Sequence, residues 1–394
     1  MFPADIRHIM QRILTGLFTV LVSTISLSAA EHDQPRDSLT GTKRNIVTKI
    51  IDYFGTANKH ELSRRPDFSI IGGPHYSSDT KFGIGLVAAG IYSTDPSDTT
   101  LYPSNFSLYG DISTAGFYMI GIRGSHIFPR DTRRINYDIY LSSFTTYFWG
   151  IGYTYNSRDK NKTSYKDLRV TISADYLWRI GRHIYAGPTV EYNFIRASDI
   201  KANEFLWGGE SRSTNSYGIG VTARYDTRDH LTDPYSGWFI QIDQRFYPRF
   251  LFNGNYNFSA TEIGINNYTS VWKGGVIASR AHLDYTIGHT PWGLLPSLGG
   301  SHTMRGYYEG RYRDKIATDV TIELRQHIYR RSGAVVWLGA GSIMEKFSDF
   351  RWKDILPNAG IGYRWEFKKR TNVRLDLGFG KGEWGFIFNI NEAF

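Results

Sequence analysis

The sequence predicts an all-β fold: a transmembrane antiparallel β-barrel of about sixteen strands with a short N-terminal helix. Three observations support this prediction. From Asp67 onward, apolar and polar residues alternate in segments of about ten residues divided by polar or Gly/Pro breaks, as in membrane-barrel strands. The chain is 15% aromatic, which suits girdles of Tyr and Trp at the two membrane interfaces. Its mean hydropathy of −0.36 is too polar for a helical membrane protein, whereas only every second residue of a barrel strand faces lipid.

Composition also excludes several classes of function. The chain has no cysteine, which excludes disulfides, thiolate nucleophiles and thiolate metal sites. The net charge of +9 is spread along the chain rather than clustered, so we expect no nucleic-acid binding. The 11 histidines lack metal-ligand spacing, and no serine is positioned beside His282 and Asp284, which both face inward on one strand. We therefore expect no enzyme, no catalytic residue, no cofactor and no metal.

Residues 1–30 have the pattern of a secretory signal peptide. Arg7 and Arg12 give a basic start, an apolar run follows over Ile13–Leu27, and small residues precede Glu31. A membrane anchor is the alternative, but about fifteen apolar residues are short of the ~20 that a span requires. Either Met1 or Met10 is the start, since the segment from Met10 onward already has the usual proportions.

Residues 31–66 are expected to form a polar leader and an amphipathic helix. The helix is predicted at about 43–54, where apolar residues recur at helical spacing. It either tethers the chain beneath the barrel or plugs the mouth of the barrel. The barrel itself is assigned to residues 67–394.

Alternation is clearest near the C-terminus. Apolar Val320 and Ile322 alternate with charged Asp319, Glu323 and Arg325. Because side chains alternate across a strand, the charged set must face a wet lumen if the apolar set faces lipid. Sixteen such segments begin near residues 67, 81, 102, 116, 134, 165, 182, 214, 236, 257, 273, 318, 333, 356, 371 and 383.

The breaks between segments differ in length. The long polar breaks at 93–100, 154–164, 197–212 and 287–317 are expected to be extracellular, and short turns such as 330–332 periplasmic.

The longest break carries a specific resemblance. Its Arg305-Gly306-Tyr307 tip resembles the Arg-Gly-aromatic motif in the sixth extracellular loop of the BamA/TamA outer-membrane assembly superfamily, also called the bacterial surface antigen family. Four other stretches resemble that family in the same order: Asp226, Arg228 and Asp229 with Pro234 and Gly237; Ile322–Arg325; Ala359–Trp365 with Val373–Asp376; and Ile390–Phe394.

The resemblance implies that Arg305 folds back inside the barrel and locks the loop against carboxylates. One expected partner in the family is an Asp, but the corresponding stretch Trp337–Gly341 has none. The inward-facing substitutes are Asp319, Glu323, Glu366 and Asp376, of which Glu323 is favoured because Arg325 flanks it. The predicted lock comprises Arg305, Gly306, Tyr307, Glu323 and Asp376. The alternative is that Arg305 only tips a solvated loop.

The closing strand is expected to end at Phe394, with Phe386, Phe388, Ile390 and Phe394 facing outward. It must pair with the first strand or leave backbone groups unsatisfied in lipid. Gly72, Gly73 and Pro74 in the first strand favour weak pairing at this seam, because Pro lacks a donor and Gly weakens strands.

The family's polypeptide-binding (POTRA) domains do not fit within residues 31–66, so the resemblance is to a branch without them. It implies an integral protein of the Gram-negative outer membrane that inserts or translocates polypeptide or lipid. The alternative is a gated or plugged passive channel. Expected partners are outer-membrane lipids, client polypeptides and accessory lipoproteins.

Overall fold

The computed structural model describes residues 67–77, 81–98, 101–201, 204–368 and 370–394. The signal peptide, the polar leader and the helix expected at 43–54 lie outside the described residues. No helix in the described part of the chain is both long and apolar enough to cross a membrane.

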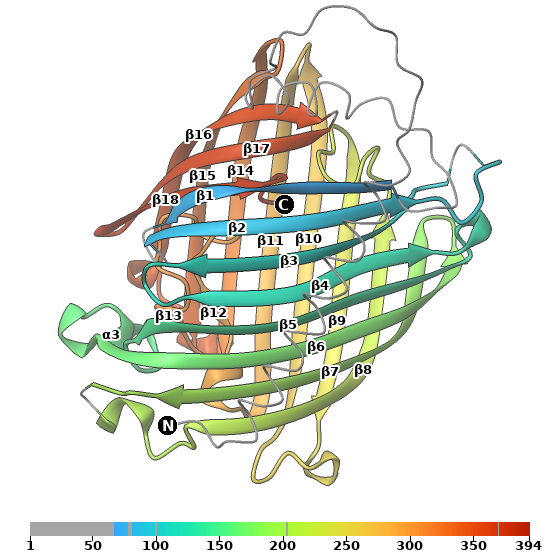
Figure 1. The fold of residues 1–394 in the computed structure, drawn as a ribbon. Helices are drawn as coiled ribbons and strands as arrows, with labels where there is room; N and C mark the ends of the chain where they lie inside the picture. Colours follow the sequence, from blue (N-terminus) through green and yellow to red (C-terminus); the bar gives the residue numbers. More distant parts are fainter. Residues whose placement is uncertain (1–66, 78–80, 99–100, 202–203, 369) are drawn as a thin grey trace, which may run out of the picture. The chain divides into compact units, whose positions relative to one another are not determined.

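The described chain is all-β, and 16 strands form one antiparallel sheet in which each strand pairs with its neighbours in sequence (Figure 1). The strands are β1 Asp67–Ser77, β2 Lys81–Tyr92, β3 Ser104–Ser113, β4 Tyr118–Ile127, β5 Arg133–Phe148, β6 Thr163–Gly181, β7 Ile184–Ser198, β8 Ser213–Asp226, β9 Gly237–Tyr247, β10 Asn257–Trp272, β11 Gly275–His289, β14 Ile316–Tyr329, β15 Ser332–Met344, β16 Leu356–Lys368, β17 Thr371–Gly380 and β18 Glu383–Ile390.

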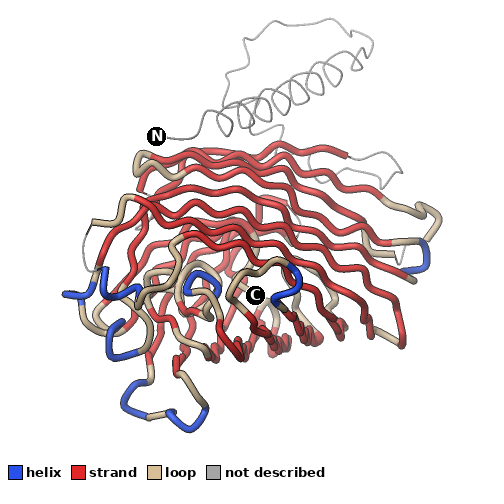
Figure 2. The backbone as a smooth tube through the Cα atoms, turned by 90° about the horizontal axis from the view of Figure 1, so that it is seen from below, coloured by secondary structure: helices blue, strands red, loops and turns tan. Residues whose placement is uncertain are grey.

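Short elements occupy the connections. The strands β12 (Ser297–Leu298) and β13 (Tyr312–Arg313) form a separate pair within the long connection from β11 to β14. Among the described residues, Figure 2 shows helical turns only between strands. They are α3 (Tyr153–Asn156) and 3-10 turns at Pro129–Asp131, Asp159–Asn161, Glu204–Trp207, Arg249–Leu251, Trp292–Leu294, Phe347–Asp349 and Trp352–Asp354.

The two faces of the sheet follow the alternation of the sequence. On β14, Val320 and Ile322 are more than half exposed, whereas Asp319 and Glu323 are buried on the opposite face. The apolar face therefore points outward and the charged face lies inside the curl of the sheet. This confirms the antiparallel all-β prediction and the inward direction of the charged set.

The order of the strands corrects one expectation. Successive connections of an antiparallel meander lie at alternate ends of the sheet, so residues 93–98 and 101–103 share an end with the turns 227–236 and 330–331. The Tyr102 hydroxyl accordingly donates to the Arg228 carbonyl, 2.7 Å away. The described residues of the break at 93–100 therefore do not lie with the other three long breaks, because strand parity rather than polarity or length sets the end. We call the end with residues 227–236 and 330–331 the turn end, and the opposite end, with the other three long breaks, the loop end.

An aromatic cluster closes the loop end. Trp292 is 1% exposed, and its ring lies edge-on to Trp207 with the ring centroids 4.5 Å apart. Phe148 and Tyr165 each pack against the same ring, with centroids 5.5 Å away. Edge-to-face contacts of this kind stabilise beyond the area they bury. The cluster joins the ends of β5 and β6 to the connections after β7 and β11 in one packed cap.

The sheet curls until its first and last strands, β1 and β18, lie side by side (Figure 1). No hydrogen-bonded ladder joins these two strands among the described residues, although a ladder joins every other adjacent pair. The sheet thus has two edges that face each other.

We predict that Trp292→Ala lowers the free energy of unfolding by about 3–5 kcal/mol, because it empties the centre of the aromatic cap. Urea titration of the folded protein in detergent, followed by circular dichroism, measures this change. The matched control is Trp352→Ala, where the ring is 81% exposed and the expected change is within about 0.5 kcal/mol. If both substitutions lowered the free energy of unfolding equally, the aromatic cap would not stabilise the fold as we predict.

Candidate functional site

The connection between β11 and β14 folds back against the inner face of the sheet. Its two legs pair through β12 and β13, and its side chains Leu298, Met304, Tyr307 and Tyr312 form a buried cluster with Ala317, Ile343 and Leu356 of β14, β15 and β16. Burial of these apolar side chains holds the loop on the strands rather than in solvent.

Arg305 lies at the tip of this loop and is 2% exposed. Its Nη1 donates to the Asp376 carboxylate on β17 at 2.7 Å, and its Nη2 donates to Glu323 on β14. The guanidinium carbon sits 3.7 Å from the centre of the Trp337 ring on β15, a cation–π contact. Two carboxylates and one ring from three strands therefore hold the guanidinium on separate sides.

Further charged side chains surround the ion pairs of Arg305 with Glu323 and Asp376. Asp376 also accepts from Arg364 at 2.5 Å and from Arg374 at 3.1 Å, and Glu323 accepts from Arg325 at 2.7 Å. Buried charges are tolerated only when opposite charges and hydrogen bonds surround them. Four guanidinium groups, those of Arg305, Arg325, Arg364 and Arg374, are matched by the carboxylates of Glu323, Asp376, Glu392 and Asp233.

Gly306 allows the loop to touch the strand behind it. Its φ is +113°, and a Cβ at this position would lie 2.6 Å from the carbonyl carbon of Gly378 on β17. A Cβ at Gly378 would in turn lie 2.3 Å from the Arg305 carbonyl oxygen. The loop and the strand approach so closely that both positions require glycine.

Tyr307 extends the attachment toward the next strands. Its hydroxyl donates to the Pro357 carbonyl on β16 at 2.7 Å and accepts from the Lys381 backbone N–H at 2.7 Å. The loop is therefore fixed to β14, β16, β17 and the turn that follows β17. We call Arg305, Gly306, Tyr307, Glu323 and Asp376 the loop lock.

The other two acids that the sequence offered as partners of Arg305 contact different groups. Asp319 faces His282, and Glu366 accepts the backbone N–H of Arg370. Trp337 begins the stretch in which the family has an Asp and this chain has none. Its ring, rather than a carboxylate from this stretch, contacts Arg305. Asn358 had no signal in the sequence, yet its side-chain amide donates to the Arg305 carbonyl.

The strand-turn motif builds the turn end. Asp226 accepts from Nε and Nη2 of Arg228, each at 2.9 Å, and Arg134 lies 3.9 Å from the same carboxylate. Asp229 accepts the backbone N–H of Tyr235 at 2.8 Å and Nη2 of Arg370 at 2.8 Å. The motif therefore shapes its own turn and connects it to the turn between β16 and β17.

Asp233, in the same turn, was not singled out from the sequence. It is 4% exposed, and its carboxylate accepts from Asn372 at 3.2 Å while its carbonyl accepts from Arg370 at 2.7 Å. Burial, and then the nearby Glu392 carboxylate, raise the pKa of Asp233 to about 6. Asn372 also donates to Glu392 at 2.9 Å, so this turn-end network reaches the last residues of the chain.

The closing strand agrees with the prediction over part of its length. Phe386 and Phe388 pair opposite Leu377 and Leu375, on the face away from Asp376. The backbone of Ile390 pairs with Val373, and its side chain lies outside the described residues.

The expectation that Phe394 ends this strand on the outward face is wrong. β18 ends at Ile390, and Asn391 has a left-handed backbone, with a φ of 69°. The chain then turns inward, where the Phe394 carbonyl accepts from Arg325 at 2.9 Å and the Ala393 carbonyl lies 2.9 Å from Nδ1 of His302. The physical reason is Glu392, whose carboxylate binds Arg364 on the inner face at 2.8 Å.

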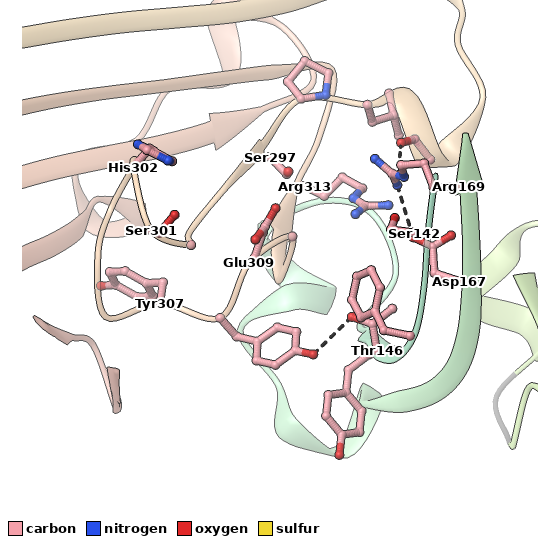
Figure 3. Close-up of a pocket in the computed structure, with 18 of the residues that line it drawn as sticks. Ser142, Thr146, Asp167, Arg169, Ser297, Ser301, His302, Tyr307, Glu309 and Arg313 are labelled. Atoms are coloured by element: carbon pink, nitrogen blue, oxygen red, sulfur yellow. Dashed lines mark hydrogen bonds and ion pairs between the residues drawn. The ribbon is translucent and has the colours of Figure 1, made fainter. Parts of the chain in front are cut away.

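A cavity of about 1350 Å³ lies beside the lock loop. Figure 3 shows Ser301, His302 and Glu309 of the loop on one side and Asp167 and Arg169 of β6 on the other. The lining is about half polar and half apolar, and on its polar side Arg169 lies 3.4 Å from Asp167. The loop therefore occupies part of the interior and leaves an open space of mixed polarity next to it.

We predict that Arg305→Ala costs about 3–5 kcal/mol of stability and lowers the folded yield, because it removes one charged partner from each of two buried carboxylates. The electrophoretic mobility of heated and unheated samples, together with refolding yield, measures both effects. Arg351→Ala is the control, since that side chain is 54% exposed. Adding Glu323→Gln to Arg305→Ala should recover part of the loss. Unchanged mobility and yield in Arg305→Ala would refute the lock.

We also predict a pH dependence from Asp233. Its folded-state pKa is raised from 3.8 to about 6, so its contribution to stability is full below pH 3.8 and is lost as the pH rises through about 6. Relative to Asp233→Asn, the wild type should lose about 2–3 kcal/mol of unfolding free energy between pH 4 and pH 7. Urea titrations of both proteins across this range measure the difference, and parallel curves would exclude the effect.

Comparison with known proteins agrees with this geometry. The Omp85 superfamily domain matches residues 120–394. Among solved structures, BamA from Haemophilus ducreyi lacking POTRA domains 1–3 superimposes with a TM-score of 0.53 and 13% identity over 83% of this chain and 70% of that one. CdiB from Escherichia coli gives 0.55 and 10% identity over 86% and 69%.

No curated protein matches the sequence. At such low identities the structural likenesses establish the fold alone, whereas the domain match covers most of the chain. The resemblance to the BamA/TamA proteins is thereby confirmed, and the chain belongs to the Omp85 superfamily.

Proposed function

We propose that this protein is an integral barrel of the bacterial outer membrane that inserts or translocates polypeptide or lipid at the seam between β1 and β18. One observation carries the proposal: these strands lie side by side without a ladder among the described residues, while all other adjacent strands are paired. A seam without a hydrogen-bonded ladder is weaker than the paired strands around it, so it is where the barrel would open or recruit a strand from a client.

The end of the chain supports this location. Asn391–Phe394 turn inward, so β18 is only 8 residues long, while β1 has 11. The withdrawn residues cannot pair with β1. Their contacts with Arg325, Arg364 and His302 hold them on the inner face instead.

The loop lock supports a sheet in which β14, β16 and β17 are held firmly together while the seam between β1 and β18 is weak. Arg305 joins β14 to β17, and Arg364 on β16 joins the same carboxylate to Glu392. These bonds resist separation of β14, β16 and β17. Opening would then be confined to the outer edge of β18, away from this network.

The proposed partners follow from this mechanism. Outer-membrane lipids contact the apolar outer face, and client polypeptides or accessory lipoproteins approach the seam. The proposal includes no enzymatic step and no nucleic acid.

The test uses the absence of cysteine in the chain. Cysteine pairs, one in Asp67–Ser77 and one in Glu383–Ile390, are introduced and the pair that oxidises fully is selected. In vesicles containing the reduced protein, we predict faster folding of a small unfolded barrel protein or faster movement of a labelled lipid between leaflets. Oxidation should suppress that rate at least about tenfold, and a reductant should restore it.

The control pair is Ile322→Cys with Leu338→Cys, directly opposed positions on the already paired strands β14 and β15. Its oxidation should leave the rates unchanged. Vesicles that accelerate neither process, or a cross-linked seam without effect, would refute the proposal.

The cavity favours a second candidate, a passive channel partly filled by the lock loop. If the loop acts only as a plug, deletion of residues 299–314 should raise single-channel conductance in planar bilayers severalfold, while the seam disulfide should not change it. An unchanged conductance after the deletion would exclude the channel.

A further inference from the structure

We propose that Glu262, His282 and Asp284 bind a divalent first-row transition-metal ion on the inner face of the sheet, with Asp319 positioning the histidine. None of these residues belongs to the loop lock or to the turn-end network. The proposed site lies on β10, β11 and β14, away from the seam.

Strand register places the three ligands together. Glu262 on β10 is directly opposite Asp284 on β11. His282 is two residues before Asp284 on the same strand and therefore shares its face. One ligand atom from each residue lies within 4.8 Å of the other two.

The distances suit a metal ion. Nε2 of His282 is 3.5 Å from Oε1 of Glu262 and 3.9 Å from Oδ1 of Asp284. These are long for hydrogen bonds. With metal–ligand bonds of about 2.1 Å, a tetrahedral site places its ligand atoms about 3.4 Å apart, so only small movements are required.

Asp319 provides an independent observation. Its side chain is fully buried, and Nδ1 of His282 lies 3.4 Å from its Oδ1. Neither carboxylate oxygen receives a hydrogen bond from the described residues. A buried carboxylate behind Nδ1 favours the tautomer with its proton there, which leaves the Nε2 lone pair free. The same carboxylate–histidine–metal arrangement orients histidine ligands in metalloproteins generally.

The surrounding charges favour a cation. Asp243 on β9 is directly opposite Glu262, so three carboxylates stand in a row across β9, β10 and β11. Like charges in directly opposed positions repel.

Two arginines are near this row. Arg245 is closest to Glu191, at 3.1 Å, but it also lies 3.7 Å from Asp243 and 3.8 Å from Glu262. Arg280, the next inward residue before His282, donates to the His302 carbonyl at 3.0 Å. Arg245 therefore offsets part of the charge of the row, and a divalent ion would neutralise the remainder.

The ligands are accessible from the interior. The side chains of Glu262 and Asp284 are 37% and 33% exposed, and both line the 1350 Å³ cavity. Gly264 is opposite His282 on β10, and a Cβ there would meet open space. The site thus has room for an ion and its remaining water ligands.

One imidazole and two carboxylates suit Zn²⁺ or Mn²⁺ better than Ca²⁺ or Mg²⁺, which prefer all-oxygen sites. The competing arrangement is a doubly protonated His282 that forms ion pairs with the acids and binds no metal. The two alternatives differ in whether added metal is bound.

The experiment uses the full-length protein, purified without a polyhistidine tag and stripped with EDTA. Titration calorimetry with ZnCl₂ should show saturable binding of one ion per chain. Glu262→Gln, His282→Asn and Asp284→Asn should each weaken binding at least about tenfold, and Asp319→Asn about 10- to 100-fold. With Co²⁺, Asp319→Asn should retain the visible absorption spectrum of the wild type at saturation, because it is not itself a ligand.

The matched control is Asp175→Asn, which removes an inner-face carboxylate that binds Arg224 instead. It should bind Zn²⁺ as the wild type does. Heat-dependent mobility checks the folding of every variant. If a ligand variant does not fold, pulsed EPR of Cu²⁺-loaded wild type decides, since the site predicts a coordinated imidazole nitrogen. Absence of saturable binding, equal binding in all variants, or a spectrum without imidazole coupling would overturn the proposal.

Discussion

The ion pairs of Arg305 with Glu323 and Asp376 are the interaction on which the rest of the interior depends. A guanidinium that is 2% exposed is tolerable only where carboxylates are already in place. This requirement sets the inward parity of β14 and β17. It also requires glycine at positions 306 and 378, where the loop and the strand come into contact.

Much of this could be predicted from the sequence. Alternation predicts the strands from β1 to β18 and places Glu323 and Asp376 on the inner face, because side-chain direction depends only on local parity. Parity alone left four inward acids as candidate partners of Arg305, since it gives no distance across the interior, and Glu323 was favoured only because Arg325 flanks it. Asn358 carries no pattern that distinguishes it from other polar residues on inner positions.

Other features escaped prediction because they depend on groups distant in sequence. The pattern of Phe386, Phe388 and Phe394 continues through Glu392, but the carboxylate binds Arg364 and turns the chain inward. The end at which residues 93–103 lie follows from counting strands. His282 and Asp284 face inward on one strand, but Glu262 joins them only through the pairing of β10 with β11, so spacing along the chain did not point to Glu262.

The meander has a consequence for how the molecule folds. Each ladder joins neighbours in sequence, so the sheet can grow hairpin by hairpin at a low entropic cost of loop closure. The meeting of β1 with β18 is different, because almost the whole sheet separates them in the chain. Until they meet, a nascent sheet presents two long edge strands whose backbone groups can pair with another chain. Aggregation is therefore the main hazard of its biogenesis.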